Sequence, residues 1–307
     1  MHPKVGVILI NWNSFNHTSN CIQSLQLCDY PNFEIIVVDN GSEDGSGNLL
    51  KTTYPEINLI ASPTNEGFAA GNNRGFEYAS QQQFPYAMML NNDVFVEPDF
   101  LSKLVQYMET HPKVGAIQPK IFFNHDRKKI WNGGSYFLPW LGWTYAKRYQ
   151  RKAGELQNQF QQVDWITGCA FLTKTAILKE TGLLKEAFFI YYEDADLSFR
   201  ISSKGYQLIF HPQSVIYHIA GSSNIVKVKS KEGYVKPIVH YLNSRNHIWF
   251  LKTWTKWYQW PSTLLTLILY YLSNMLYFAI RWRIGKLKSL LRGIYDGYKP
   301  IPIKLIR

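Results

Sequence analysis

The residues of this sequence best placed for chemistry are carboxylates and amides that directly follow apolar runs. The clearest is Asp93, which comes after the apolar run 87–90 and the amides Asn91 and Asn92. A carboxylate at the end of a buried strand is unfavourable unless a cation, a metal or a row of backbone donors pairs with it. We therefore expect Asp93 to hold a divalent metal that binds a diphosphate. A turn or cap after the strand is the alternative.

Asp39 is a second carboxylate of this kind, and the amide Asn40 follows it after the apolar run 33–38. Before Asn-Gly-Ser, the position is compatible with a tight turn. It is also compatible with a carboxylate that accepts a hydrogen bond from a uracil or thymine imide, or from a ribose hydroxyl. Asn11 and Asn13 follow the first apolar run in the same way. We expect the amides at these strand ends to bind the donor together with Asp39, and they are Asn11, Asn13, Asn40, Asn91 and Asn92.

The segment 65–76, NEGFAAGNNRGF, combines glycines with amides and a cation at the predicted start of a helix. Backbone N–H groups at a helix start, together with a cation, can approach a diphosphate closely. Glycines also serve close packing of a helix on a strand, and that alternative stays open. The residues that we expect to contact the diphosphate are Gly67, Asn72 and Arg74.

Three acids, Glu193, Asp194 and Asp196, follow the aromatic run 188–192. Acids so close together repel one another, so we expect them to serve a purpose. For Asp196 we favour stabilisation of a helix N-terminus. For Asp194 we predict a general base whose pKa is tuned by its neighbour Glu193. His218 is compatible with a metal ligand, a phosphate contact or a structural histidine.

Strand-like and helix-like segments alternate through residues 4–121. The apolar strands are continuous rather than alternating, which indicates a mainly parallel sheet covered by helices on both faces. Ligands of such sheets bind at the carboxyl ends of the strands. The polar clusters 11–13, 39–42 and 91–93 all lie at such ends, so we expect them to share one pocket.

The predicted strands of this half are 5–10, 33–38, 57–61, 86–90 and 114–122, and its predicted helices are 14–27, 44–53, 67–83 and 99–110. Residues 123–163 break the alternation and are rich in Trp, Tyr and basic side chains. We expect either a hairpin that only packs or a surface that contacts an acceptor. Further strands are predicted at 163–173, 206–210 and 215–219, and a helix at 234–258.

Composition favours a globular chain, with 46% apolar, 18% charged and 16% aromatic residues. Cys21, Cys28 and Cys169 form no CxxC pair, so neither a disulfide framework nor a zinc site is indicated, and we expect a reducing, cytoplasmic compartment. The first apolar run is too short for a signal peptide and predicts a first strand instead.

Positive charge is concentrated in the C-terminal region. Residues 227–307 carry a net charge of +13, whereas residues 1–226 carry −2. We therefore predict a domain at 1–226, with halves 1–121 and 122–226, and a basic, aromatic-rich helical region at 227–307. Nucleic acid and anionic lipid are the two partners such a basic region suggests.

The uncharged stretch 262–280 is nearly long enough to span a bilayer. Polar side chains form a stripe along it, and both flanks are basic, which argues against a simple span. We expect an in-plane or re-entrant association with an anionic, cytoplasmic leaflet. A soluble helical pair, or the interface of a homo-oligomer, is the alternative.

Taken together, the motifs Asp39-Asn-Gly-Ser, Asn65-Glu-Gly-Phe, Asn91-Asn-Asp93, Gly168-Cys-Ala and Glu193-Asp194, followed by His218, resemble the family-2 inverting glycosyltransferases of the GT-A fold. Within them the chain resembles the rhamnosyltransferase-like branch, over about residues 4–250. The resemblance implies a mixed, mainly parallel Rossmann-like sheet, a nucleotide-diphosphate sugar donor, a divalent metal (Mn²⁺ or Mg²⁺) and an inverting transfer.

Carried over by position, the resemblance makes Asp39 a nucleoside ligand, Asp93 a metal ligand and Asp194 the catalytic base. His218 lies where some members place a further metal or diphosphate contact. The residues on the implied acceptor side of the pocket are Trp165 and Gly168. Asn91 stands where the family often has an acid, so we expect weaker metal binding that depends on the diphosphate oxygens.

These features favour a membrane-associated enzyme that transfers a hexosyl or deoxyhexosyl group, such as rhamnose, to a hydroxyl of a glycan or lipid-linked acceptor for cell-surface polysaccharide. We expect it at the cytoplasmic face of the plasma membrane, with no nucleic-acid partner. A sugar nucleotidyltransferase is one alternative, but the loop after the first strand lacks the expected Gly-rich, basic character. A non-catalytic lipid- or nucleic-acid-binding protein is the other, and it leaves the acids unexplained.

Overall fold

The structure is a computed structural model that describes residues 2–152, 158–220 and 225–302. It divides into two compact units. The first unit consists of Met1–Tyr136, Ala146–Glu186 and Glu193–Ala220. The second consists of Phe137–Tyr145, Ala187–Tyr192 and Gly221–Arg307. The C-terminal region thus has two earlier segments of the chain folded with it.

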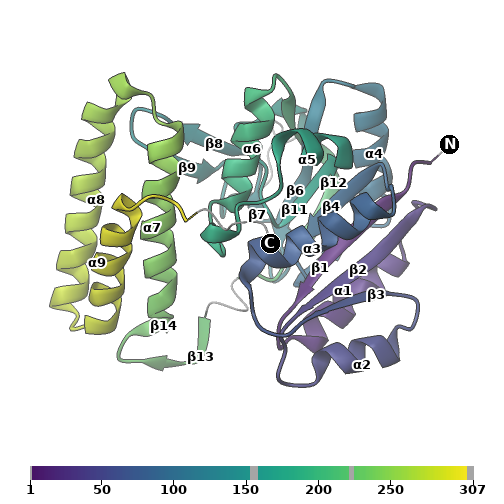
Figure 1. Ribbon diagram of the computed structural model, residues 1–307, viewed down its shortest axis with the longest axis horizontal. Helices are drawn as coiled ribbons and strands as arrows, with labels where there is room; N and C mark the ends of the chain where they lie inside the picture. Colours follow the sequence, from purple (N-terminus) through teal and green to yellow (C-terminus); the bar gives the residue numbers. More distant parts are fainter. Residues whose placement is uncertain (1, 153–157, 221–224, 303–307) are drawn as a thin grey trace. The chain divides into compact units, whose positions relative to one another are not determined.

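The first unit is built on one large sheet (Figure 1). Its main strands are β1 (Val5–Asn11), β2 (Phe33–Asn40), β3 (Asn58–Ser62), β4 (Tyr86–Leu90), β6 (Val114–Phe123), β10 (Gln161–Gln162), β11 (Ala170–Lys174) and β12 (Gln207–His218). They lie in the order β10-β12-β6-β11-β4-β1-β2-β3. β1 pairs in parallel with β2 and β4, whereas β11 is antiparallel to β4 and β6. The predicted mixed, mainly parallel sheet is confirmed.

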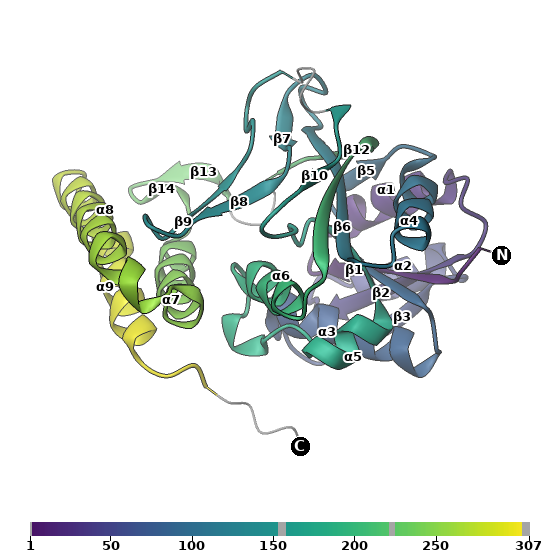
Figure 2. The same cartoon turned by 90° about the horizontal axis from the view of Figure 1, so that it is seen from above.

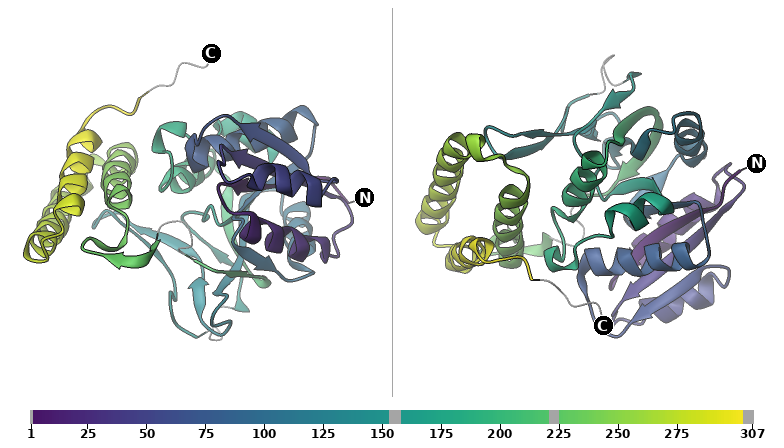
Figure 3. Two further views of the ribbon diagram at one scale, coloured as in Figure 1. Left: turned by 90° about the horizontal axis from the view of Figure 1, so that it is seen from below. Right: turned by 45° about the horizontal axis from the view of Figure 1, so that its top comes forward.

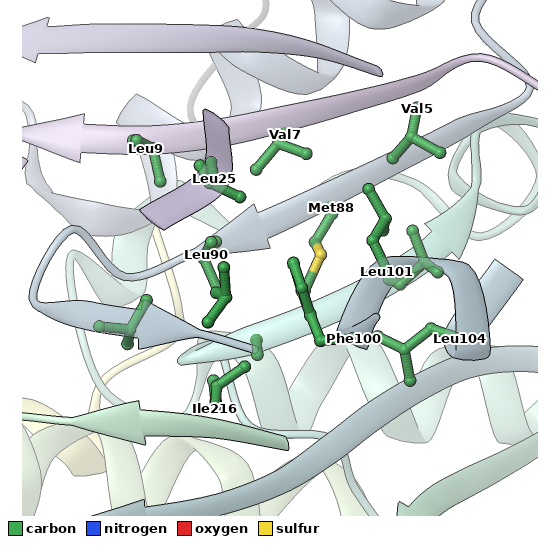
Figure 4. Close-up of a cluster of buried hydrophobic side chains, with 14 of the residues drawn as sticks. Val5, Val7, Leu9, Leu25, Met88, Leu90, Phe100, Leu101, Leu104 and Ile216 are labelled. Carbon is green, nitrogen blue, oxygen red and sulfur yellow. The ribbon is translucent and has the colours of Figure 1, made fainter. Parts of the chain in front are cut away.

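Helices cover both faces of this sheet (Figure 2). On one face lie α1 (Phe15–Gln26), α2 (Ser46–Thr53) and α4 (Phe100–Thr110), and on the other lie α3 (Gly67–Gln81), α5 (Thr175–Thr181) and α6 (Glu193–Ser203). Alternation along a strand assigns side chains to the two cores, so that Val7 and Leu9 of β1 belong to one and Ile8 to the other. Figure 4 shows the first core, in which Leu25, Met88 and Phe100 are buried together.

Three predicted elements differ in the structure. The two strands predicted at 206–210 and 215–219 form one strand, β12, with a register shift between His211 and Val215 in its pairing with β6. A shift of this kind bends a strand without ending it. The strand predicted at 163–173 begins only at Ala170. Within the predicted excursion 123–163, β7 (Ile130–Asn132) pairs with β6, and β8 (Ser135–Leu138) forms with β9 (Trp143–Ala146) a hairpin of the kind expected there.

The second unit contains three consecutive helices, α7 (Pro237–Trp254), α8 (Trp260–Ile280) and α9 (Ile284–Tyr298), which appear side by side in Figure 3. They follow the short hairpin of β13 (Ile225–Ser230) and β14 (Gly233–Val235). The sequence reading missed α9. Its close packing on α7 depends on Gly293 and Gly297, because a Cβ at Gly293 would lie 2.4 Å from the carbonyl oxygen of Tyr241 and one at Gly297 would lie 2.8 Å from Cβ of Ile248.

Residues 257–280, which include α8, form a helical segment long and apolar enough to cross a membrane. An 18-residue window within it has a mean hydropathy of 1.6, and 22% of that window is buried. One face of α8 is exposed and apolar. Its most exposed aliphatic side chains are Leu265, Leu269, Leu272, Leu276 and Ile280, each between 55% and 66% exposed. The opposite face packs inside the second unit through Leu267, Tyr271 and Phe278.

Candidate active site

Asp39 is held at the end of β2 by an amide from the neighbouring strand. Asn11, fully buried, is the register partner of Asp39, and its Nδ2 donates to Asp39 Oδ1 at 2.8 Å. The same Nδ2 lies 3.2 Å from Ser42 Oγ and 2.8 Å from Ser46 Oγ. The Thr18 hydroxyl donates to Asn11 Oδ1 at 2.8 Å. This network fixes the orientation of the Asp39 carboxylate, which is half-buried.

The loops that follow β1, β2 and β3 are tied together by Asn13 and Asn40. Asn13, at φ 49°, accepts at Oδ1 from the Glu43 backbone N–H at 2.8 Å. Buried Asn40 donates from Nδ2 to the carbonyl of Gly67 at 3.1 Å and accepts from the Glu66 N–H at 3.1 Å. Asn13 and Asn40, both predicted to bind the donor, therefore hold the loops at the carboxyl ends of these strands in place.

Gly67, Asn72 and Arg74 all lie in the first half of α3, which begins at Gly67 as predicted. Arg74 forms an ion pair with Glu66, with 2.6 Å between Arg74 Nη2 and Glu66 Oε2. The buried Asn72 donates to the Phe68 carbonyl at 2.9 Å, and its Oδ1 has no hydrogen-bond partner among the described residues. The cation predicted to meet a diphosphate is thus already neutralised by a neighbour.

Asp93 and His218 form a buried pair where β12 ends. His218 Nε2 lies 3.0 Å from Asp93 Oδ1, and the Asn91 amide nitrogen lies 3.3 Å from Nε2. Burial by itself disfavours the imidazolium, but the neighbouring Cys169 and the bond to Asp93 outweigh it and raise the pKa of His218 to about 10. β5 (Val94–Val96), which pairs with β12, brings the two residues together although they are far apart in the sequence.

A divalent metal would find two protein ligands here. Asp93 supplies a carboxylate, and Nε2 of His218, which faces that carboxylate, would supply a nitrogen once a metal displaced its proton. The described residues contain no group of three or more His, Cys, Asp or Glu that could hold a metal. Mg²⁺ and Mn²⁺ bound with a nucleotide take few protein ligands and complete their shell with phosphate oxygens and water. The two residues fit such a metal.

Asp194 is held where α6 begins. Its Oδ2 accepts from the Gly168 backbone N–H at 2.7 Å, and its Oδ1 accepts from the Ala195 N–H at 2.7 Å. The side chain is surrounded by protein yet partly accessible. Burial raises the pKa of Asp194, and the two N–H donors oppose that shift. A half-buried carboxylate with a raised pKa is suited to accept a proton near neutral pH.

Glu193 and Asp196 occupy different environments from Asp194. Glu193 is 3% exposed, and burial followed by the charge of Asp194 raises its pKa well above the ordinary value, so Glu193 is the neutral member of the pair. Its Oε2 has no hydrogen-bond partner among the described residues. Asp196 is fully buried between Arg200 Nε at 2.9 Å and Lys185 Nζ at 2.8 Å, a structural ion pair.

Hydrogen bonds join these clusters at one edge of the first unit. Asn92 donates to Thr18 at 2.8 Å, and Thr18 reaches Asp39 through Asn11. On the other side, the Asn91 N–H donates to the Cys169 carbonyl at 2.9 Å, and Gly168, the preceding residue, donates to Asp194. The sequence predicts that three strand ends lie close together. The structure brings those ends together and links them to Asp194 through the hydrogen bonds of Asn91 and Gly168.

Gly168 and Trp165 were predicted to lie on the acceptor side. A Cβ at Gly168 would lie 3.1 Å from Phe68 Cε1 and 3.4 Å from Asp194 Oδ2, so the position favours glycine. Trp165 is half-buried, and its Nε1 donates to the Tyr136 carbonyl at 3.4 Å. Thr18 and Ser46 were not singled out from the sequence. They are ordinary helix residues there, and only the fold places them beside Asn11.

The fold and this edge define the class of protein. The structure resembles a GalNAc-T7 crystal structure titled with UDP, GalNAc and Mn²⁺, with a TM-score of 0.61 and 14% identity over 84% of this chain and 49% of that one. It also resembles the mannosyltransferase PcManGT of Pyrobaculum calidifontis, titled with GDP-Man and Mn²⁺, with a TM-score of 0.58 and 15% identity over 97% of this chain and 87% of that one. The fold is that of the GT-A glycosyltransferases.

The sequence comparisons give the family. Residues 6–182 match the model of glycosyl transferase family 2, and the chain belongs to this family. A curated relative, the N-acetylglucosaminyl-diphospho-decaprenol L-rhamnosyltransferase of Mycobacterium tuberculosis, is 24% identical over 81% of this chain and 87% of its own. Glycosyltransferase GlyG of Streptococcus pneumoniae is 21% identical over 80% of both chains. The predicted family and fold are confirmed.

The buried, neutral Glu193 gives a stability prediction. A group whose pKa is raised by folding contributes most at low pH, and that contribution is lost as pH rises. We expect Glu193→Gln to raise the Tm at pH 7.5, by roughly 2–4 °C for each kcal/mol gained. The gain should shrink as pH falls toward 4.5, the ordinary value for Glu. Differential scanning fluorimetry across pH measures both. The exposed Glu77→Gln is the control, and a Glu193→Gln protein less stable at every pH would contradict the prediction.

Proposed function

We propose that this chain is an inverting glycosyltransferase. It transfers a sugar from a nucleotide-diphosphate donor to a hydroxyl of a glycan or lipid-linked acceptor in cell-surface polysaccharide synthesis. The observation that carries the proposal is the Asp194 carboxylate, held by the Gly168 N–H and connected through Cys169 and Asn91 to the Asp93–His218 pair. A base thus lies in the same network as a site for a metal and a diphosphate. The similar rhamnosyltransferase makes rhamnose the first donor sugar to test.

Each cluster has a role in this proposal. Asp39, oriented by Asn11, accepts from the base or ribose of the donor nucleotide. The N–H groups at the start of α3 and the amides Asn91 and Asn92 surround the diphosphate. Asp93 and His218 would hold Mn²⁺ or Mg²⁺, which when bound neutralises the charge of the departing diphosphate.

Asp194 accepts the proton of the acceptor hydroxyl as that oxygen attacks the anomeric carbon. The attack comes from the face opposite the diphosphate, so one displacement inverts the anomeric configuration. No covalent intermediate on the protein forms, in contrast to retaining glycosidases with their second carboxylate.

The base assignment is tested with Asp194→Asn. We expect kcat to fall by about 10²–10⁴-fold, the usual contribution of a general base, with donor affinity within a few-fold of the parent. A panel of UDP-, GDP- and dTDP-sugars, screened first by thermal shift with Mn²⁺, identifies the donor. The exposed Asp29→Asn is the matched control.

Donor affinity that falls as far as kcat in Asp194→Asn would overturn the role of the base. The anomeric configuration of the product, measured by NMR, tests inversion separately. A product that keeps the configuration of the donor would contradict the single-displacement mechanism.

The metal assignment predicts that EDTA stops transfer and that Mn²⁺ or Mg²⁺ restores it. Binding of Mn²⁺ in the presence of the nucleoside diphosphate, followed by electron paramagnetic resonance, should weaken at least tenfold in Asp93→Ala. This readout does not depend on turnover. Undiminished activity in chelator, or unchanged Mn²⁺ binding by Asp93→Ala, would remove Asp93 from the metal role.

We also propose that α8 attaches the protein in-plane or re-entrantly to the cytoplasmic face of an anionic membrane. Its exposed aliphatic face is flanked by exposed Trp257 and Trp282 and by basic residues such as Lys256 and Arg281. Aromatic side chains at headgroup level and nearby cations favour an interfacial position, with each cation worth about 1 kcal/mol.

For in-plane attachment, carbonate extraction should release the parent protein from membranes, whereas a spanning or re-entrant helix would be retained. The double variant Leu269→Glu with Leu276→Glu should lose membrane association in flotation assays. A matched pair of exposed leucines in the first unit, Leu27→Glu with Leu49→Glu, should keep it. Equal loss in both pairs, or retention after carbonate, would contradict in-plane attachment.

A further inference from the structure

The second unit contains a cavity that the proposed chemistry does not use. Its volume is about 290 Å³, at the lower end of the range for small-molecule sites. Its walls come from β9, α7, α8, α9 and the segment 187–192, all within this unit. The described residues that line it include no Asp, Glu, Lys or Arg. An anion such as a diphosphate would find no countercharge there.

Aromatic rings form part of the wall. Trp143 of β9 and Tyr270 of α8 meet edge to face, with 4.9 Å between ring centroids, and each is 37% exposed. Tyr192 stacks on His247, with centroids 5.4 Å apart and 16° between the rings. Ring faces of this kind provide flat apolar surfaces.

Polar groups lie among these rings. Nε2 of His240 is buried and has no hydrogen-bond partner among the described residues. Burial lowers the pKa of His240 to about 4, so the ring is neutral and can donate or accept one hydrogen bond. The side-chain amides of Asn243 and Asn274 also line the cavity. The Nδ2 of each amide donates to a backbone carbonyl. The Oδ1 of each amide remains as a hydrogen-bond acceptor.

Uncharged walls of aromatic faces and neutral hydrogen-bonding groups match the two sides of a sugar ring. The C–H face of a pyranose packs on an aromatic side chain, and its hydroxyls exchange hydrogen bonds with amides and imidazole. An isoprenoid or acyl chain would leave the polar groups unsatisfied, which costs about 1–3 kcal/mol for each.

The backbone of Tyr192 is held in place within the second unit. Asn246 Nδ2 donates to the carbonyls of Phe188, Ile190 and Tyr191 at 2.8–2.9 Å. Tyr191 and Tyr192 adopt φ of 74° and 70°, a conformation uncommon for side chains of this size, which such contacts must stabilise. The wall that Tyr192 forms is therefore fixed before any ligand binds.

Tyr192 precedes Asp194 by two positions in the sequence. The chain cannot separate their α-carbons by more than about 7 Å. The chain therefore continues from this wall of the cavity to the proposed base with one residue between Tyr192 and Asp194.

We propose that this cavity binds one uncharged pyranose of the acceptor. The assignment of this sugar to the acceptor rests on the proposed function, but binding of a sugar in the cavity can be tested without transfer. Saturation-transfer NMR of the full-length protein with free N-acetylglucosamine, glucose, galactose and rhamnose should detect binding of at least one sugar. Trp143→Ala should abolish that signal, whereas Trp140→Ala, an exposed tryptophan between β8 and β9 that does not line the cavity, should preserve it.

Kinetics separate an acceptor sugar from the donor sugar. Trp143→Ala and Asn274→Ala should each raise KM for the acceptor about tenfold and leave KM for the nucleotide sugar unchanged. Absence of transfer with every donor, with sugar binding intact, would overturn the proposed function and keep the site. Absence of sugar binding by the parent protein, equal binding by Trp143→Ala, or a rise in donor KM alone would overturn the cavity proposal.

Discussion

The candidate active site depends on one short turn, Gly168-Cys169, and the two backbone hydrogen bonds it makes. The Gly168 N–H holds the Asp194 carboxylate, and the Cys169 carbonyl accepts from the Asn91 N–H next to the Asp93–His218 pair. Buried polar groups must find partners, so the antiparallel pairing of β11 with β4 fixes the spacing between Asp194, the proposed base, and Asp93, the proposed metal ligand. Any substitution that moves this turn therefore shifts Asp194 and Asn91 together.

The same requirement explains the abundance of asparagine at this edge. Asn11, Asn40 and Asn92 each use their side chains to connect loops that follow different strands. An amide can donate and accept without carrying charge, so it can be buried where another carboxylate would repel Asp39 or Asp93. Arg74 and Asp93 already have charged partners, so in the proposed function the charge of the donor diphosphate is balanced by a metal and by the α3 N-terminus.

Much of this could be predicted from the sequence, because it depends on local patterns. Continuous apolar runs identified β1, β2, β4 and β6, and polar clusters at their ends marked the functional edge. The start of α3 at Gly67 and the order of motifs leading to Asp194 were also visible. Two elements could not be predicted from the sequence. β12 looked like two strands, because the register shift between His211 and Val215 resembles a break. α9 was missed because its packing depends on glycines that face α7.

The sequence by itself determined which residue types reach the strand ends, because side-chain periodicity and turn chemistry act over a few residues. Only the tertiary structure decided how they combine. It paired His218 with Asp93, neutralised Arg74 with Glu66, and made Asp196 a structural ion pair while leaving Asp194 partly accessible. The pairing of His218 with Asp93 depends on a contact between distant segments, and the other outcomes depend on how the chain around each side chain is buried. Spacing along the sequence does not reveal burial. Two neighbouring carboxylates therefore differ in the structure, where Asp196 is held in an ion pair and Asp194 stays accessible, as the proposed base requires.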